Sequence, residues 1–379
     1  MHARLGLVIV VGCVLFSLTG VAGEEDKPGL INPSLNANDD AFIGRQSGVF
    51  LQEADAVLKR VPPALQEPEE RKLALYLIDA VLHDTRAPNR PEVQTFYHTR
   101  MEETAQSLET TKVTSGLRIW KMYNHGFIAR TATVTVAFDL FRGPAQFRWD
   151  APDGRKGIPS PDFPISDELA KRLVQQCDVL FVSHPHDDHA DPFVVTTFLE
   201  QGKPVIGPEN VFQGKPLGEK ITHLKREAHT EQTLAIQNGQ RNLKVVIYPG
   251  QQYQDGGPQN NVSLVITPEG LSFAHNGDQI NDPYPAYQED FKWIDAVREH
   301  HRVDVLMTNN WTMDMARMAK GFNPKLVLLG HQNEMGHQMN DRVPYWGDAK
   351  FLGLNVDEAR AAGYPVLNMA WGESILLVP

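Results

Sequence analysis

The spacing of hydrophobic residues changes near residue 115. Between about residues 40 and 108, apolar residues recur every three or four positions, which predicts amphipathic helices. From Leu117 onward, short apolar runs rich in β-branched residues are separated by polar turns, which predicts strands and loops. The sequence therefore predicts a helical segment followed by a larger α/β domain. The first helical face is expected to contain Val49, Leu51, Ala54, Val57 and Leu58.

The α/β part opens with two expected strands, 117–123 and 131–138, joined by a turn at Asn124-His125-Gly126-Phe127. A third apolar run, 177–183, has the composition of a buried strand. Glycine- and proline-rich segments between the runs predict surface loops. Further strands are expected over 203–208, 243–248, 262–267, 271–275, 303–308 and 325–330, with helices over 167–176 and 193–200.

A dense polar cluster, His184-Pro185-His186-Asp187-Asp188-His189, directly follows the strand 177–183. The loop at the carboxyl end of a strand is where open α/β sheets usually place their chemistry. Imidazole and carboxylate groups are the ligands that zinc and similar divalent cations take from proteins. A solvated turn is usually built from Gly, Asn, Asp and Ser instead. The cluster therefore predicts a metal site.

Two further strand ends carry polar residues. His275-Asn276-Gly277-Asp278 follows an alternating strand, and His331 follows the apolar run 325–330. Asn309 and Asn310 end the strand between them and are expected near the same pocket. No GxSxG motif and no cysteine nucleophile context occurs, so a serine- or cysteine-based hydrolase is not supported.

The order of these motifs resembles the metallo-β-lactamase superfamily of metal-dependent hydrolases, whose HxHxDH signature matches HPHDDH here. The resemblance covers roughly residues 117–379. It implies an αββα sandwich of two mixed β-sheets flanked by helices, with the helical segment in front. It also implies that His184 and His186 bind one metal ion (site one) and that Asp188 and His189 bind a second (site two).

By the same resemblance, Asp278 bridges the two ions, His331 completes site two, and Asp188 orients the attacking water as the catalytic residue. Asp139, at the end of the second strand, matches a residue that supports the loop 184–189, called the metal loop below, from beneath. His275 is expected to support the site rather than to bind metal. The implied cofactor is Zn²⁺, one or two ions, with Mn²⁺ or Fe²⁺ as alternatives.

One position departs from the superfamily pattern. Gln252 stands where the third histidine of site one is expected, and a neutral amide is a poorer zinc ligand than imidazole. His229 and His337 are alternative ligands for that position. Glu334 and His337 lie three residues apart and are expected either to line the pocket or to support its loop.

The formal net charge of −11 argues against a nucleic-acid partner. The opening NHGF turn resembles the superfamily branch that contains lactonases and N-acyl phosphatidylethanolamine phospholipase D. This branch implies a small-molecule or lipid-like substrate with an ester, lactone or phosphodiester bond. The alternative is a non-catalytic or single-metal relic that acts as a binding or scaffold protein. The sequence makes no prediction of the oligomeric state.

The N-terminal residues predict export. His2 and Arg4 precede an apolar stretch over 5–18, and Val21-Ala22-Gly23 has the small residues of a cleavage site. We expect a signal peptide over 1–23, a linker over 24–39, a helical segment over 40–115 and the hydrolase domain over 116–379. The mature chain would then be periplasmic or extracellular, with no stable transmembrane span. An uncleaved membrane anchor and a lipid on Cys13 are the alternatives.

Overall fold

The computed structural model describes residues 42–82, 87–144, 162–252, 257–279, 287–310, 312, 315–332, 335 and 356–378. The expected signal peptide and linker lie outside these residues, as do Glu334 and His337. The described residues belong to one compact unit that begins at Phe42.

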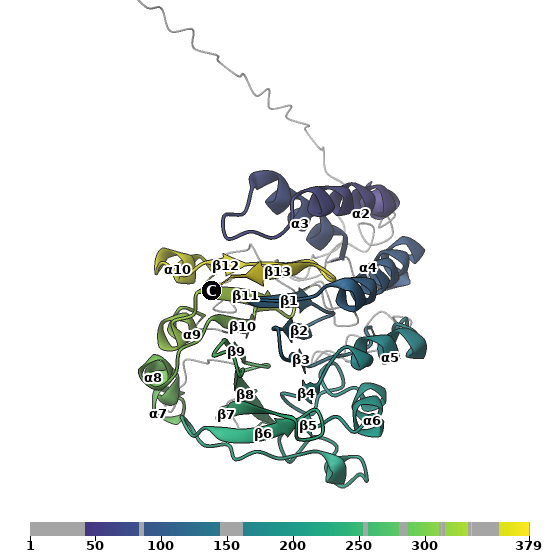
Figure 1. Ribbon diagram of the computed structural model, residues 1–379. Coiled ribbons are helices and arrows are strands. Elements are labelled where there is room, and N and C mark those ends of the chain that lie inside the picture. Colours follow the sequence, from purple (N-terminus) through teal and green to yellow (C-terminus); the bar gives the residue numbers. More distant parts are fainter. Residues whose placement is uncertain are drawn as a thin grey trace, which may run out of the picture. The chain divides into compact units, whose positions relative to one another are not determined.

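The described strands form two mixed β-sheets (Figure 1). Their bounds are β1 (Leu117–Lys121), β2 (Phe127–Arg130), β3 (Thr135–Phe138), β4 (Val179–Phe181), β5 (Val205–Ile206), β6 (Gln232–Ile236), β7 (Arg241–Gln251), β8 (Gln259–Ile266), β9 (Ser272–His275), β10 (Val305–Asn309), β11 (Leu326–Gly330), β12 (Val366–Leu367) and β13 (Ser374–Leu377). The first sheet has the order β13-β1-β2-β3-β4-β5 and is parallel only from β3 to β5. The second has the order β12-β11-β10-β9-β8-β7-β6 and is parallel from β12 to β9.

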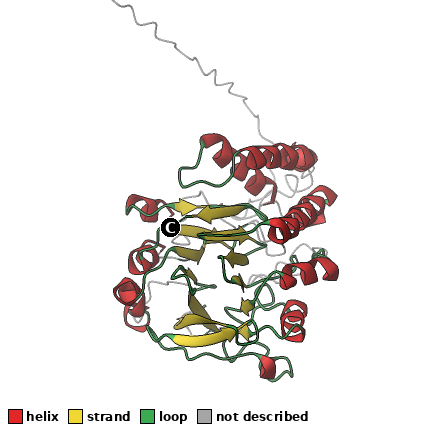
Figure 2. Ribbon diagram, in the orientation of Figure 1, coloured by secondary structure: helices red, strands yellow, loops and turns green. Residues whose placement is uncertain are grey.

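Helices cover the outer sides of the two sheets (Figure 2). Their bounds are α2 (Phe42–Arg60), α3 (Glu69–Leu82), α4 (Pro91–Thr110), α5 (Asp167–Gln175), α6 (Pro192–Glu200), α7 (Tyr287–Asp290), α8 (Trp293–His300), α9 (Met315–Phe322) and α10 (Val356–Ala361), with 3₁₀ turns η1 (Ala87–Asn89) and η2 (Gly218–Lys220). Helices α4 to α6 lie on the outer side of the first sheet and α7 to α10 on that of the second, while α2 and α3 lie beyond β12 and β13 at one end of the sandwich (Figure 1). Among the described helices, none has the length and apolar character that crossing a membrane requires.

The central core lies between the two sheets. Phe138 of the first sheet meets Phe273 of the second edge-to-face, with 5.9 Å between ring centroids. Inward-facing residues of both sheets are buried in one cluster, as expected when two sheets pack face to face. The αββα sandwich expected from the sequence is therefore confirmed.

The three N-terminal helices pack on the same unit. Arg71 of α3 is fully buried and donates to both carboxylate oxygens of Glu373, at 2.7 and 2.6 Å. Arg100 of α4 donates from Nε to the carbonyl oxygen of Trp371 at 2.7 Å. The helical segment is thus fixed to the turn that precedes the last strand.

Two details differ from the expectations. Leu51 and Leu58 of α2 are buried as expected, but Val49 is 53% exposed, because its position on the helix points away from theirs. The run 131–138 is not one strand, since β3 begins only at Thr135. The Thr131 hydroxyl accepts hydrogen bonds from the backbone N–H groups of Thr133 and Val134, both at 3.3 Å, and so closes a turn.

Candidate metal centre

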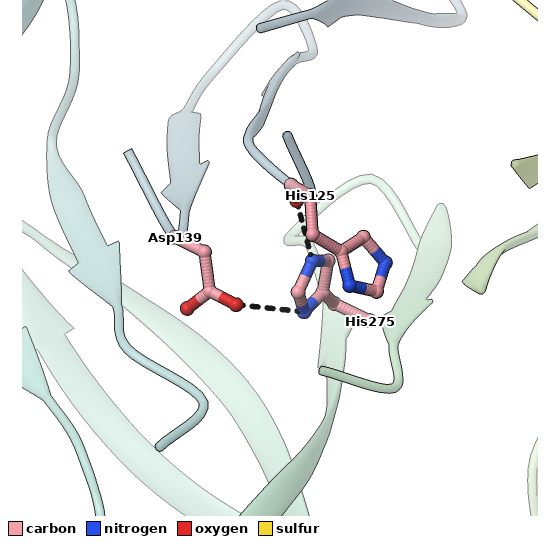
Figure 3. Close-up of side chains that lie close together, drawn as sticks. All are labelled: His125, Asp139 and His275. Atoms are coloured by element: carbon pink, nitrogen blue, oxygen red, sulfur yellow. Dashed lines mark hydrogen bonds and ion pairs between the residues drawn. The ribbon is translucent and has the colours of Figure 1, made fainter. Parts of the chain in front are cut away.

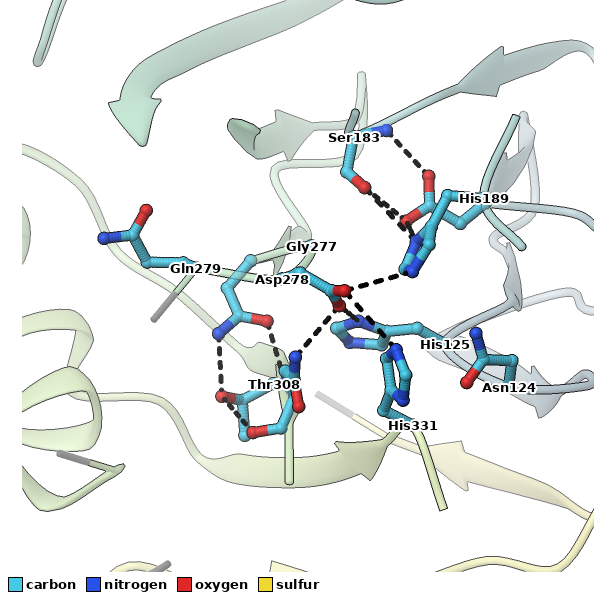
Figure 4. Close-up of polar contacts among 12 residues, drawn as sticks. Asn124, His125, Ser183, His189, Gly277, Asp278, Gln279, Thr308 and His331 are labelled. Carbon is cyan, nitrogen blue, oxygen red and sulfur yellow. Dashed lines mark hydrogen bonds and ion pairs between the residues drawn. The ribbon is translucent and has the colours of Figure 1, made fainter. Parts of the chain in front are cut away.

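The carboxyl ends of parallel strands bring the polar motifs together. In the second sheet, β9, β10 and β11 run parallel and end at His275, Asn309 and Gly330. In the first sheet, β4 leads into the metal loop, whose far end is fixed by Asp191. This residue caps α6 by accepting hydrogen bonds from the first backbone N–H groups of the helix. The polar segments after these strands converge in one place (Figure 4).

The structure brings all six expected metal ligands into two groups. In each group, every residue offers a donor atom, and these atoms lie within 4.8 Å of one another. The groups match the two sites implied by the sequence resemblance. That they bind metal stays a prediction. The first group is His184, His186 and Asp278, and the second is Asp188, His189 and His331.

Asp278 lies between the two sites. Its Oδ2 atom is 3.6 Å from Nε2 of His184 in site one. The same oxygen is 3.4 Å from Nε2 of His189 and 3.4 Å from Nε2 of His331 in site two. A single carboxylate oxygen therefore faces imidazole nitrogens of both sites, which is the position that a bridging ligand requires.

The donor set fits divalent cations. Among the described residues, no hydrogen-bond partner satisfies Nε2 of His184, although its ring is fully buried. Buried polar atoms without partners are rare in proteins, because they lose water and gain nothing in return. A cation beside Asp278 would give this nitrogen a partner.

The charges in the centre also suit a cation. Burial alone raises the pKa of Asp278, but the imidazoles of His331 and His189 outweigh it and hold that pKa well below its usual value. Burial, together with the nearby His189, lowers the pKa of His184 to about 3. The Asp278 carboxylate is therefore ionised and the His184 ring neutral, which are the protonation states that metal ligands need. The His189 ring differs: burial lowers its pKa, but Asp188 and Asp278 outweigh it and hold that pKa well above its usual value, so a cation would displace a proton there.

Asp139 supports the metal loop from beneath, as expected. Its Oδ1 atom accepts from the backbone N–H of Ser183 at 2.7 Å, and its Oδ2 atom from the Ser183 hydroxyl at 2.6 Å. The Nδ1 atom of His189 lies 2.7 Å from the same Oδ2. Burial raises the pKa of Asp139, but His189 and His275 outweigh it and hold that pKa at about 2. The carboxylate thus keeps Nε2 of His189 turned toward the centre.

Two asparagines also hold the acidic candidate ligands: Asn309, which was expected near the pocket, and Asn124, to which the sequence assigned no such role. Asn124 donates from Nδ2 to Oδ2 of Asp188 at 2.7 Å, and Asn309 from Nδ2 to Oδ1 of Asp278 at 2.9 Å. Asn124 has φ of 52°, a conformation that asparagine tolerates better than most residues. The sequence offered two signals for these roles: Asn124 stands shortly before the turn glycine Gly126, and Asn309 ends a strand.

A third group, His125, Asp139 and His275, lies next to the centre (Figure 3). His275 Nε2 donates to the backbone oxygen of His125 at 2.9 Å, and its Nδ1 accepts from the N–H of Gly277 at 3.2 Å. Both nitrogens of His275 and both oxygens of Asp139 are therefore already engaged. His275 supports the site, as expected, and this group has too few free donor atoms for a further ion.

Gln252 faces site one. Its Nε2 atom lies 3.1 Å from Nδ1 of His186 and 3.2 Å from Oδ2 of Asp278. His229, one alternative for the missing ligand, lies elsewhere: its ring stacks on His300 at 4.0 Å and contacts Tyr248. That alternative is wrong, and the other, His337, lies outside the described residues.

No protein-family model and no curated protein matches the chain. Three solved structures show the range of similar folds. A metallo hydrolase from the archaeon Ignicoccus hospitalis is 12% identical with a TM-score of 0.45, over 69% of this chain and 99% of that one. An isothiocyanate hydrolase from Delia radicum gut bacteria is 13% identical with a TM-score of 0.47, over 69% and 100%. The diiron β-hydroxylase CmlA from Streptomyces venezuelae is 14% identical with a TM-score of 0.45, over 71% and 55%. Similarity this low says nothing about the substrate of this chain.

Proposed function

We propose that this chain, which has the αββα fold and the ligand order of the metallo-β-lactamase superfamily, is a metal-dependent hydrolase. The observation that carries the proposal is the place of Asp278 Oδ2, within 3.4–3.6 Å of imidazole nitrogens from both sites. A divalent cation held there lowers the pKa of a water molecule and polarises the bond to be cleaved. Zn²⁺ is the expected ion, with Mn²⁺ and Fe²⁺ as alternatives.

Asp188 is the residue to which we assign the orientation of the attacking water. Its side chain lies in site two, with Oδ2 3.1 Å from Nε2 of His189. Asn124 holds the same oxygen from the other side at 2.7 Å. Burial raises the pKa of Asp188, but His189 outweighs it and keeps the pKa far below its usual value. The group is therefore a hydrogen-bond acceptor over the whole physiological pH range.

An open hollow of about 440 Å³ lies next to the segment that follows Gln252, and no candidate metal ligand is among its described lining residues. Pro258 lines it and accepts a hydrogen bond at 3.4 Å from the backbone N–H of Gln252. The described lining holds three amide side chains and one carboxylate, and no cationic side chain: Glu209, Asn210, Gln213, Gly257, Pro258 and Gln259. This lining does not discriminate between the expected ester, lactone and phosphodiester substrates, because no candidate metal ligand belongs to it.

The test is a hydrolysis assay of the metal-loaded chain with a chromogenic ester, a lactone and a chromogenic phosphodiester. We expect hydrolysis of at least one of these substrates, loss of activity with a chelator, and recovery on adding Zn²⁺ or Mn²⁺. Asp188→Asn should reduce the rate by at least about 100-fold, the usual contribution of a positioned acid–base group. Asp187→Asn is the matched control, because Asp187 is exposed in the same loop.

Metal content separates an enzyme from a relic of the fold. Elemental analysis of the purified chain should find bound metal, with two ions at full loading. A chain that binds no ion, even when excess Zn²⁺ or Mn²⁺ is supplied, would contradict the proposal and favour a binding or scaffold protein.

We also propose that the protein is exported, on the evidence of the positive start, the apolar stretch and Val21-Ala22-Gly23. N-terminal sequencing of the native protein should then find a first residue near Glu24. A cytosolic chain with Met1 intact would refute export. A lipid-modified Cys13, lost in Cys13→Ser, would identify the anchored alternative.

A further inference from the structure

Gln252 is held at site one by its backbone. It directly follows β7, whose last residue, Gln251, pairs with Gln259 at the start of β8. The Gln251 N–H also donates to Oε1 of the buried Gln279 at 2.8 Å. Gln252 itself is only 6% exposed. Its side chain is therefore directed at the metal ligands by the sheet and is not a surface group lying nearby.

One polar atom of the Gln252 amide makes no hydrogen bond to the described residues. Its Nε2 atom faces Nδ1 of His186 and Oδ2 of Asp278, while its Oε1 atom is buried without a hydrogen-bond partner in the described part of the chain. The oxygen and nitrogen of an amide exchange places by a half-turn of the side chain. Rotating the Gln252 amide in this way would break no hydrogen bond of Oε1, because Oε1 makes none to the described residues.

A cation in site one reverses which amide atom is favourable. It takes the lone pair of His186 Nδ1 and the charge of Asp278, so neither remains free to accept from an N–H group. The NH₂ group of Gln252 would then face a positive charge, whereas the amide oxygen would face it favourably.

We propose that Gln252 is the fourth protein ligand of site one, through its side-chain oxygen. This inference rests on the proposed function, because it requires metal at the centre. Site one then has two imidazoles and two oxygens (His184, His186, Asp278 and Gln252), which is the same count of nitrogen and oxygen donors as site two. The amide is neutral, so the only carboxylate of site one is Asp278, which it shares with site two. Site two has a second carboxylate, Asp188, and therefore more negative charge.

This ligand set changes the choice of metal. Exchanging an imidazole for an amide oxygen weakens Zn²⁺ binding more than Mn²⁺ binding, because Mn²⁺ accepts oxygen ligands more readily. Site one should therefore be the weaker and more exchangeable position, and its preference should shift from Zn²⁺ toward Mn²⁺ relative to a site with three histidines.

The experiment measures affinity and not activity. The metal-free full chain is titrated calorimetrically with Zn²⁺ alone and with Mn²⁺ alone, for the parent, Gln252→His and Gln252→Leu. We expect Gln252→His to strengthen the weaker Zn²⁺ binding event by at least about tenfold and to change Mn²⁺ binding less, and Gln252→Leu to weaken both by about tenfold or more. Gln240→His, in the exposed turn between β6 and β7, controls for an added histidine and should change neither.

The visible absorption of the Co²⁺-loaded chain reports ligation directly. Its bands should differ between the parent and Gln252→Leu, because one ligand is lost. The inference is overturned if Gln252→His leaves the weaker Zn²⁺ event unchanged, or if Gln252→Leu leaves both affinities and the Co²⁺ bands unchanged while the tight site still binds. If the parent binds no ion at either site, the proposed function itself fails, and the two failures are thus distinguishable.

Discussion

The Oδ2 atom of Asp139 lies 2.7 Å from Nδ1 of His189, although 50 positions of sequence separate the two residues. Both are fully buried or nearly so. The same oxygen accepts the Ser183 hydroxyl, so one carboxylate fixes both the start of the metal loop and a ring at its end. The orientation of His189 is therefore set from beneath the centre.

Asp139→Asn should lower the affinity of site two by about 10- to 100-fold, the usual effect of losing the partner of a ligating histidine. Titration of the metal-free variant against a competing chelator measures this. Asp178→Asn is the matched control, because Asp178 is another carboxylate of the first sheet that binds a backbone N–H, that of Thr135 at 2.7 Å. If Asp139→Asn binds metal as tightly as the parent, Asp139 does not orient the ring.

Asp278→Ala should lose both metal ions, because its Oδ2 faces both sites. His331→Ala should lose mainly the ion of site two, since His331 belongs to that group only. Elemental analysis after dialysis gives the stoichiometry of each variant. The exposed His223 supplies the control, and His223→Ala should retain both ions. An Asp278→Ala chain that keeps two ions would show that this carboxylate does not bridge.

The buried pair of Arg71 and Glu373 should matter for stability. Arg71→Met leaves the Glu373 carboxylate buried without its partner, which should cost about 3–5 kcal/mol of unfolding free energy. Changing both residues to Met should cost less than the single change. Arg60→Met is the control, because Arg60 and Glu70 are 62% and 53% exposed and such pairs contribute about 1 kcal/mol or less. Urea unfolding measures all three variants, and a loss below that of the control would contradict the expectation.

A chain that starts at Ser115 should not fold stably. Without α4, the aromatic group around Trp371 loses Tyr97, which contacts Trp371 and Tyr123 at ring-centroid distances of 5.5 and 5.4 Å. Large apolar side chains of the first sheet would then be exposed to water. Circular dichroism and binding of a hydrophobic dye should report a loosely packed state, in contrast to a chain that starts at Glu24. A stable and active shortened chain would show that the helices are dispensable.

The fold and the two groups of candidate metal ligands were predictable because the candidate ligands lie in short polar segments that follow apolar runs. The change from apolar to polar residues marks where a buried strand ends, so the loop after β4 and the residue after β11 could be located from sequence. The roles of Asn124 and Asn309 were not predictable, since an asparagine in a turn is usually explained by backbone conformation alone. Likewise, the direction of Gln252 depends on how β7 pairs with β8, and register is a long-range property. The β-branched composition around Thr131 predicts a strand, whereas the structure has a turn there, because the turn depends on a side-chain hydrogen bond that composition does not reveal.

The pairing of β1 with β13 joins the opening of the sandwich to the end of the chain, and the Arg71–Glu373 contact spans 302 positions. Contacts so distant in sequence form only after nearly the whole polypeptide is available. During synthesis, β1 and Arg71 are therefore made long before β13 and Glu373, the segments that they contact. The β1–β13 pairing and the Arg71–Glu373 contact therefore belong to the contacts that form late in folding.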